Sequence, residues 1–176
     1  TYLGYWKKGG GACGEHSHAI NLFQSFAYAS NIGRINQVSA SMEYINDGIL
    51  DFDSICLLNF VTEKNIIGRV VQDVVTQPTR KWARAQCDRG FIEWLCGNKP
   101  GIDTVIHGIN SEEIHTEEIL KTRPDDFFEE MKHIHAVVEN KKSFSKSPIT
   151  LERGLETMLV IAASHISAKN NCSVSI

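Results

Sequence analysis

The sequence lacks several features that would place the protein in a specialised class. No apolar run approaches the roughly 18 residues of a membrane span, and the closest, Met158 to Ala163, lies inside a helical pattern. No block of Lys and Arg is present and the formal net charge is −3, which argues against nucleic-acid binding. No secretory signal pattern opens the chain. We therefore expect a soluble globular protein with neither a membrane nor a nucleic acid as partner.

Cysteine is present, but not in a pattern that builds a disulfide framework or a zinc knuckle. Five cysteines are scattered along the chain without a C-x-x-C pair: Cys13, Cys56, Cys87, Cys96 and Cys172. This usage indicates free thiols and a cytoplasmic location. At 176 residues the chain is long enough for one domain with its own core. It begins at Thr1 rather than Met, as a fragment or a processed product would.

The chain after its first glycines predicts a helix from about Glu15 to Ala29. Ile20, Phe23, Phe26 and Ala27 recur at three- and four-residue spacing and make one apolar stripe. Asn31-Ile32-Gly33 follows as a stop signal, because glycine readily adopts the left-handed conformation that closes many helices.

The middle of the chain predicts strands over residues 37–44, 54–61, 66–76, 81–87, 91–96 and 103–107. Range 54–61 is apolar almost throughout, as expected of a strand covered on both faces. Range 66–76 carries apolar residues on both faces of the strand. One face should therefore be covered by helices, and the other by something else. Asp88-Arg89-Gly90 predicts a tight hairpin in which the glycine has a positive φ.

The last third predicts two helices and a short final strand. Apolar residues at helical spacing mark both helices, one of which follows Pro124 while the other is capped by Thr150. The stripes are Phe127, Met131, Ile134 and Val138 in the first, and Leu151, Leu155, Leu159 and Ala162, expected to pack inward, in the second. Strands segregated from helices imply an α+β fold, with an open, mostly antiparallel sheet and helices packed on one face.

Residues 9 to 21, GGGACGEHSHAIN, join three glycines to a glutamate and two histidines. One interpretation is a flexible loop that leads into a helix. Under this interpretation, Glu15, His16 and His18 lie close together in the sequence by coincidence. Another is a metal site, because Gly10-x5-His16-x-His18 is similar to the first half of a cupin ligand motif. However, no ligand residue stands where that motif needs its glutamate, and residues two apart on a helix point in different directions. We expect no metal.

The third interpretation is a site for an organic substrate. Small residues let a ligand approach the backbone, and a helix start offers free N–H groups to an oxyanion or hydroxyl. Histidine titrates close to neutrality and can exchange a proton with an alcohol. In one helix, Glu15, His18 and Asn21 would share a face at three-residue spacing. His16, Tyr5 and Trp6 are further candidates for lining such a pocket.

Several segments together resemble the C-terminal domain of the glucose–fructose oxidoreductase, inositol dehydrogenase and rhizopine catabolism family. KKGGGACGEHSHAINLF looks like the signature GGG-x-x-x-x-G-x-H-x-x-D-L that opens this domain. RAQCDRGFIEWL is similar to its hairpin, and DDFFEEMKHIHAVVENKK to its penultimate helix. ITLERGLETMLVIAASHISAKNNCSVSI is similar to its closing helix and strand. The resemblance runs from about Tyr5 to the C-terminus.

The resemblance implies an oxidoreductase that transfers hydride between NAD or NADP and a sugar, cyclitol or related polyol. In that family an N-terminal Rossmann domain binds the dinucleotide and carries a catalytic lysine in a Glu-Lys-Pro motif. Neither Glu63-Lys64-Asn65 nor Asn98-Lys99-Pro100 is that motif. Residues 1–176 are therefore expected to be one substrate-binding and oligomerisation domain, with the Rossmann domain absent from this chain. The resemblance also implies a homo-oligomer formed through the open sheet face.

Residue by residue, the resemblance places the motif histidine, the expected catalytic acid or base, on His18. The later Asp of the motif falls on Asn21, which can still bind a hydroxyl. The family's catalytic Asp falls on Gly14, so Glu15 or His16 would have to take its part. This departure suggests a distinct substrate, such as a nucleotide-linked or acidic sugar. It also leaves an alternative open, a non-catalytic sugar-binding or scaffolding module that has lost the dehydrogenase chemistry.

Overall fold

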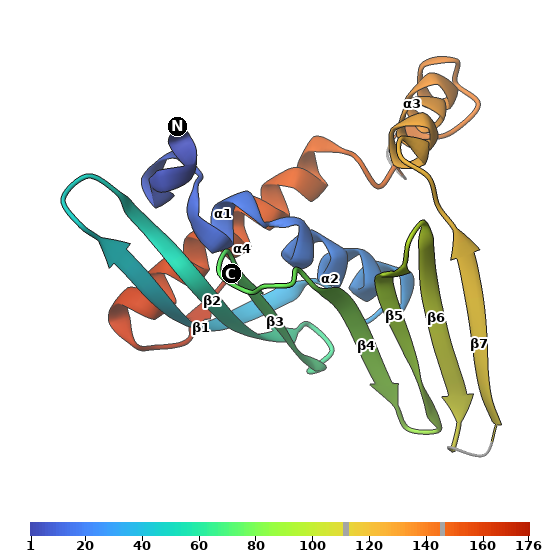
Figure 1. Cartoon of the computed structure of the whole chain (residues 1–176), viewed down its shortest axis with the longest axis horizontal. Coiled ribbons are helices and arrows are strands. Elements are labelled where there is room, and N and C mark those ends of the chain that lie inside the picture. Colours follow the sequence, from blue (N-terminus) through green and yellow to red (C-terminus); the bar gives the residue numbers. More distant parts are fainter. Residues whose placement is uncertain (111–112, 145–146) are drawn as a thin grey trace. The chain divides into compact units, whose positions relative to one another are not determined.

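The computed structural model describes residues 1–110, 113–144 and 147–176, which form two compact units. The first contains Thr1–Val75 and Ser145–Ile176, and the second contains Thr76–Phe144. Figure 1 shows the elements in chain order. Across the described residues, no helix combines the length and apolar character that a bilayer crossing requires.

The first unit is built on an antiparallel sheet with the strand order β3-β2-β1-β8. Val38, Leu58 and Phe60 line its buried face, and none is more than 1% exposed. Phe23 lies against Phe60, with ring centroids 5.1 Å apart. The elements are η1 (Tyr2–Gly4), η2 (Trp6–Lys8), α1 (Gly11–Glu15), α2 (His18–Ala29), β1 (Ile35–Asn46), β2 (Asp51–Thr62), β3 (Ile67–Asp73), α4 (Leu151–Asn170) and β8 (Val174–Ser175). Helices α1, α2 and α4 contribute to the same core on this face, which confirms the predicted α+β fold.

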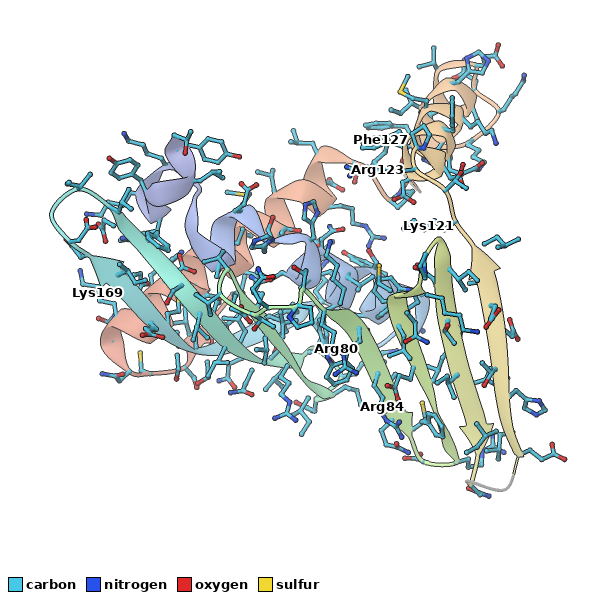
Figure 2. The ribbon with its side chains drawn as sticks, in the orientation of Figure 1. Arg80, Arg84, Lys121, Arg123, Phe127 and Lys169 are labelled. Carbon is cyan, nitrogen blue, oxygen red and sulfur yellow. The ribbon has the colours of Figure 1, made fainter. Side chains whose placement is uncertain are left out.

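The second unit holds another antiparallel sheet, with the strand order β4-β5-β6-β7. Arg84 on the edge strand β4 (Figure 2) pairs with Glu93 at 2.8 Å and lies over the ring of Phe91. A charged edge strand resists pairing with other chains. The elements are β4 (Lys81–Cys87), β5 (Gly90–Lys99), β6 (Ile102–Ile109), β7 (Glu113–Leu120) and helix α3 (Asp125–Val138).

Two details of the strand predictions are wrong. Strand β7 was not predicted, because its residues are all exposed and its charges hide any apolar alternation. Gly90 is not among the residues with positive φ. Glycine is needed there for another reason, since a Cβ atom would lie 2.2 Å from the carbonyl oxygen of Gly108 on the neighbouring strand.

Strand β2 is covered on one face only, contrary to the prediction for residues 54–61. On its other face Leu57 is 43% exposed, and Val71, its partner on β3, is 59% exposed. Ile67, further along β3, is 81% exposed. The helices of the first unit therefore leave an apolar sheet face uncovered, in line with the doubled apolar pattern of β3.

Helix α4 packs with a different face from the one predicted. Leu151, Leu155 and Leu159 are each more than half exposed. The buried residues are instead Thr157, Val160, Ala163, Ser164 and Ser167. Small side chains let the helix approach β1 closely, and Ser167 Oγ accepts a hydrogen bond from the Ala40 amide at 2.9 Å. The predicted cap is confirmed, since Thr150 accepts a hydrogen bond from the Arg153 amide.

Candidate functional site

The glycine segment packs tightly against the residues before it and against itself. A Cβ atom on Gly10 would lie 2.3 Å from the carbonyl oxygen of Leu3. A Cβ atom on Gly14 would lie 2.7 Å from the carbonyl oxygen of Gly9. Only a residue without a side chain tolerates such approaches of backbone to backbone. Packing within the chain therefore accounts for the glycines at these two positions.

Asp53 fills the N-terminal end of α1. Gly11 has a φ of +80°, and a Cβ atom there would lie 1.9 Å from Asp53 Oδ1. The carboxylate is fully buried, and its Oδ2 accepts a hydrogen bond from the Cys13 amide at 2.6 Å. Burial raises the pKa of Asp53, although the hydrogen bond from the Cys13 amide opposes this. Asp53 thus occupies the place where a phosphate group would bind at a helix start.

Residues 9 to 14, GGGACG, also have the spacing G-x-G-x-x-G of a dinucleotide-binding loop. That motif works when it follows a strand and opens a helix whose free amides hold the pyrophosphate. Here the segment follows η2, α1 has only 5 residues, and Asp53 already accepts from the Cys13 amide. The stretch is therefore not a dinucleotide-binding loop.

The predicted helix over 15–29 is divided in two. Helix α1 ends at Glu15, the chain turns at His16 and Ser17, and α2 begins at His18. Because α1 is fixed by Asp53, the chain must turn before α2 can lie on the sheet. The prediction that Glu15 shares a helix face with His18 is therefore wrong. Glu15 instead accepts a hydrogen bond from the Tyr2 hydroxyl at 2.8 Å.

His18 and Asn21 are the predicted site residues that share one face of α2. His18 is exposed, and no hydrogen bond or ion pair holds its imidazole within the described part of the chain. Asn21 donates to Thr157 Oγ1 over 3.4 Å. His16 is exposed in the turn before α2. No group of three or more His, Cys, Asp and Glu side chains that could hold a metal ion occurs among residues 1–110, 113–144 and 147–176.

Trp6 and Tyr5 pack beside other side chains of the first unit. Trp6 stacks on His165 with centroids 4.6 Å apart, and the Tyr44 hydroxyl lies 2.7 Å from His165 Nδ1. The ammonium group of Lys8 lies 4.5 Å from the ring centroid of Tyr5. A role for Trp6 and Tyr5 in binding substrate stays a prediction.

Two fully buried thiols lie next to this aromatic cluster. A hydrogen bond between Cys13 and Cys56 lowers the pKa of Cys13, and His165 lowers it further, while burial acts in the opposite direction. All five cysteines are free, as the sequence predicted. Cys13 therefore ties α1 to the core through its side chain as well as through its amide.

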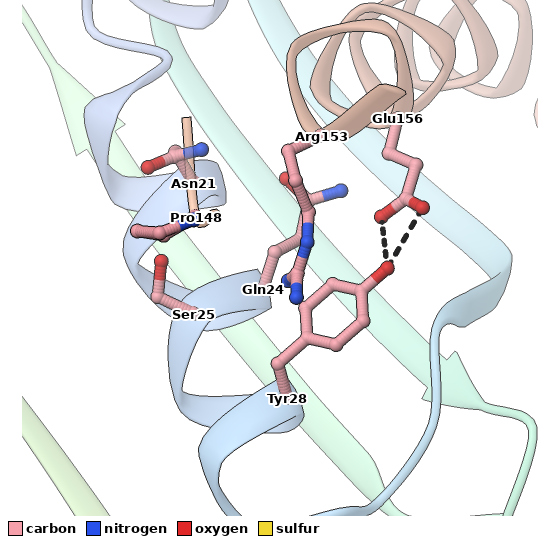
Figure 3. Close-up of a pocket in the computed structure, with 7 residues that line it drawn as sticks. All are labelled: Asn21, Gln24, Ser25, Tyr28, Pro148, Arg153 and Glu156. Atoms are coloured by element: carbon pink, nitrogen blue, oxygen red, sulfur yellow. Dashed lines mark hydrogen bonds between the residues drawn. The ribbon is translucent and has the colours of Figure 1, made fainter. Parts of the chain in front are cut away.

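A hollow of about 110 Å³ opens between α2 and the first turns of α4 (Figure 3). The Tyr28 hydroxyl lies 2.7 Å from each carboxylate oxygen of Glu156. Arg34 Nε lies 3.2 Å from the same carboxylate. Burial, followed by the hydrogen bond to Glu156, raises the pKa of Tyr28. The hollow is lined by Asn21, Gln24, Ser25, Tyr28, Pro148, Arg153 and Glu156.

Sequence reasoning identified Asn21 but missed the residues opposite it. Arg153 and Glu156 are three apart in the first turns of α4, so they share a face. Ser25 continues the stripe of His18 and Asn21 along α2. This spacing is visible in the sequence, but local periodicity does not say which helix faces which.

Comparisons with known proteins give the fold but no match in sequence. No model of a known protein family matches the chain, and no curated protein sequence does so. An aldose-aldose oxidoreductase from Caulobacter crescentus, complexed with glycerol, is similar in structure, with a TM-score of 0.76 at 14% identity. An inositol dehydrogenase homolog from Azotobacter vinelandii, complexed with NAD+, is similar with a TM-score of 0.72 at 12% identity. The WlbA dehydrogenase from Bordetella pertussis, in complex with NADH and UDP-GlcNAcA, is similar with a TM-score of 0.64 at 13% identity.

These matches cover 96–98% of this chain but only 47–49% of the other proteins. The chain thus has the fold of about half of each oxidoreductase. The fold that the resemblance implied is confirmed, and the proteins that share it are oxidoreductases.

Proposed function

We propose that this chain is the substrate-binding and oligomerisation domain of an NAD(P)-dependent oxidoreductase acting on a sugar, cyclitol or sugar derivative. The observation that carries the proposal is a fold shared with sugar-related oxidoreductases of about twice the length. The motif histidine, His18, stands exposed at the start of α2 in that fold. We place the enzyme in the cytoplasm, in keeping with its free thiols.

NAD or NADP would be bound mainly by an N-terminal Rossmann domain outside this chain. The described residues do not fit the dinucleotide, because α1 is short and its Cys13 amide, which a pyrophosphate would need, already donates to Asp53. This chain alone would therefore be inactive. Its contribution to the reaction is to hold the substrate and to handle the proton of the reacting hydroxyl.

His18 is the proposed acid or base. An imidazole without a partner can accept the proton of a substrate hydroxyl as that carbon is oxidised, and return it in the reverse reaction. Asn21, one turn further along α2, can hydrogen-bond a second hydroxyl of the same sugar. Exposure of His18 suits a site that a further domain completes.

The test is His18→Ala in the protein that joins this chain to its dinucleotide-binding part. Loss of a general acid–base group should lower kcat by about 10²–10⁴-fold, while the Kd for the dinucleotide changes little. His135→Ala, an exposed histidine on α3 paired with Glu139, is the matched control and should turn over normally. Unchanged kcat in His18→Ala would remove the role assigned to this residue.

A second candidate function is a non-catalytic sugar-binding or scaffolding module. It is favoured by Gly14, which stands at the position of the family's catalytic acid. The contact of Gly14 with the carbonyl of Gly9 leaves no room for a side chain there. Sequencing the gene upstream of Thr1 separates the two candidates. A dinucleotide fingerprint followed by Glu-Lys-Pro supports the enzyme, and a start codon directly before Thr1 supports the module.

A further inference from the structure

The hollow between α2 and α4 contains one carboxylate, and that carboxylate is already bound. Glu156 accepts from the Tyr28 hydroxyl at 2.7 Å and pairs with Arg34 at 3.2 Å. Its side chain is 15% exposed, whereas that of Arg34 is 61% exposed. Glu156 and Arg34 therefore neutralise each other at one end of the hollow.

Arg153 lines the same hollow and has no such partner. No carboxylate among the described residues lies within ion-pairing distance of its guanidinium. The group lies instead over the ring of Tyr28, as Figure 3 shows. A guanidinium on an aromatic face is held in place while the N–H groups at its edge stay free to donate. The hollow thus has a positioned cation, Arg153, that is not paired with the one carboxylate lining it.

The remaining lining residues are neutral, and all but Pro148 are polar. Asn21 and Ser25 come from α2, on the stripe that begins at His18, and can donate to or accept from hydroxyl groups. At 1.5 Å per residue, Ser25 stands about 10 Å along the helix from His18. Asn21, Ser25 and Arg153 line one hollow, so a single ligand bound there can contact these hydroxyl-binding groups and the Arg153 guanidinium together.

We infer that Arg153 is a specificity-determining residue, which binds the carboxylate or phosphate of an acidic sugar held between α2 and α4. This rests on the proposed function, because it takes the sugar on the His18 stripe to be the substrate. Guanidinium binds either anion through paired N–H···O bonds, so the shared chemistry is a planar or tetrahedral oxyanion on a polyhydroxylated ligand.

Isothermal titration calorimetry of the full chain at low ionic strength tests the inference with three probes. Glucuronate carries a carboxylate, glucose 6-phosphate carries a phosphate, and glucose carries neither. At least one anionic probe should bind about tenfold more tightly than glucose, the increment of a charge-assisted hydrogen bond. The preference should shrink as salt is added.

Arg153→Gln should reduce the affinity for the anionic probe to the affinity for glucose. Arg153→Lys keeps the charge but loses the paired N–H groups of the guanidinium, so it should retain part of the preference for the anionic probe. Lys169→Gln is the control, because it removes one charge from the same helix near its other end (Figure 2) and should change nothing. Thermal unfolding of each variant checks that the fold is kept.

Equal affinity for all three probes, binding of none of them, or a preference that survives Arg153→Gln would overturn the inference. Glucuronate alone preferred identifies a carboxylate site, and glucose 6-phosphate alone a phosphate site. None of these measurements requires hydride transfer. A failed anion site would therefore leave the proposed redox function to be decided by the His18→Ala turnover.

Discussion

Gly11 and Gly48 show, at the scale of the residue, two separate reasons for a glycine. Both have left-handed φ angles, +80° and +84°. A Cβ atom on Gly11 would collide with Asp53, whereas one on Gly48, in the turn between β1 and β2, would meet nothing within 4 Å. A side chain would strain the backbone at both positions, but only at Gly11 would it also lack space.

Gly48→Ala should cost about 1 kcal/mol of unfolding free energy, the strain of a left-handed alanine. Gly11→Ala should cost about 3 kcal/mol or more, because it also displaces a buried carboxylate from its hydrogen bond. Urea denaturation of both variants measures the difference. Equal losses would mean that Asp53 does not determine the position of α1.

The candidate site was predictable from sequence only in part. His18 and Asn21 share a helix face because three-residue spacing is a local property, and the structure keeps them together. Glu15 was assigned to the same face wrongly, because its position depends on Asp53, which is 38 residues away in the sequence. Arg153 was missed for the same reason, since it reaches Tyr28 only through the packing of two distant helices.

Helix α4 illustrates, at the scale of the element, a limit of hydrophobic periodicity. Its leucines form the more apolar stripe, yet its buried residues are Thr157, Val160, Ala163, Ser164 and Ser167. Small residues let the helix approach the sheet closely, and a buried serine hydroxyl can be satisfied within its own helix, as Ser164 Oγ donates to the Val160 carbonyl at 2.7 Å. Strand positions were predicted better, because alternation along a strand depends on neighbouring residues alone.

The hairpin of β5 and β6 depends on Asp103, which makes stability sensitive to pH. Oδ1 accepts from the Gly97 amide at 2.8 Å and Oδ2 accepts from Trp94 Nε1 at 3.1 Å. Burial acts to raise the pKa of Asp103, but these bonds and the charge of Lys121 outweigh it and hold the pKa below its ordinary value. A carboxyl with a lowered native pKa stabilises the fold above its unfolded pKa and loses this contribution as pH falls through the native value.

Asp103→Asn should therefore lower the unfolding free energy by about 1 kcal/mol at neutral pH. The difference from wild type should close in acid, once Asp103 is protonated. Urea denaturation over a pH series measures both. Asp88→Asn, at the exposed turn between β4 and β5, is the control. A difference that persists unchanged at low pH would show that the charge is not what stabilises the hairpin.

The uncovered face of the first sheet is the main feature at the scale of the whole molecule. Leu57, Ile67 and Val71 lie exposed on it, and burying such side chains against a second copy would be favourable by about 25 cal/mol per Å². We propose that the chain forms a homo-oligomer through this face. Local patterning predicted apolar residues on both sides of β3, but it could not predict that the strands divide into two sheets.

Light scattering at tens of micromolar should show a species larger than the monomer. Leu57→Lys should shift it to the monomer, because a lysine there would have to be buried without a partner. Ile49→Lys is matched in chemistry but lies in the turn after β1, 74% exposed, and should leave the assembly intact. A monomeric wild-type chain would contradict the proposal.

The contact of Gly14 with Gly9 has a consequence for any substitution at position 14. An acidic side chain at position 14 would force the carbonyl of Gly9 to move, so introducing one there would also change the backbone of the glycine segment. The glycine signature tracks a way of folding rather than a reaction. A search for these glycines alone would therefore find chains that fold this segment in the same way, whatever reaction they catalyse.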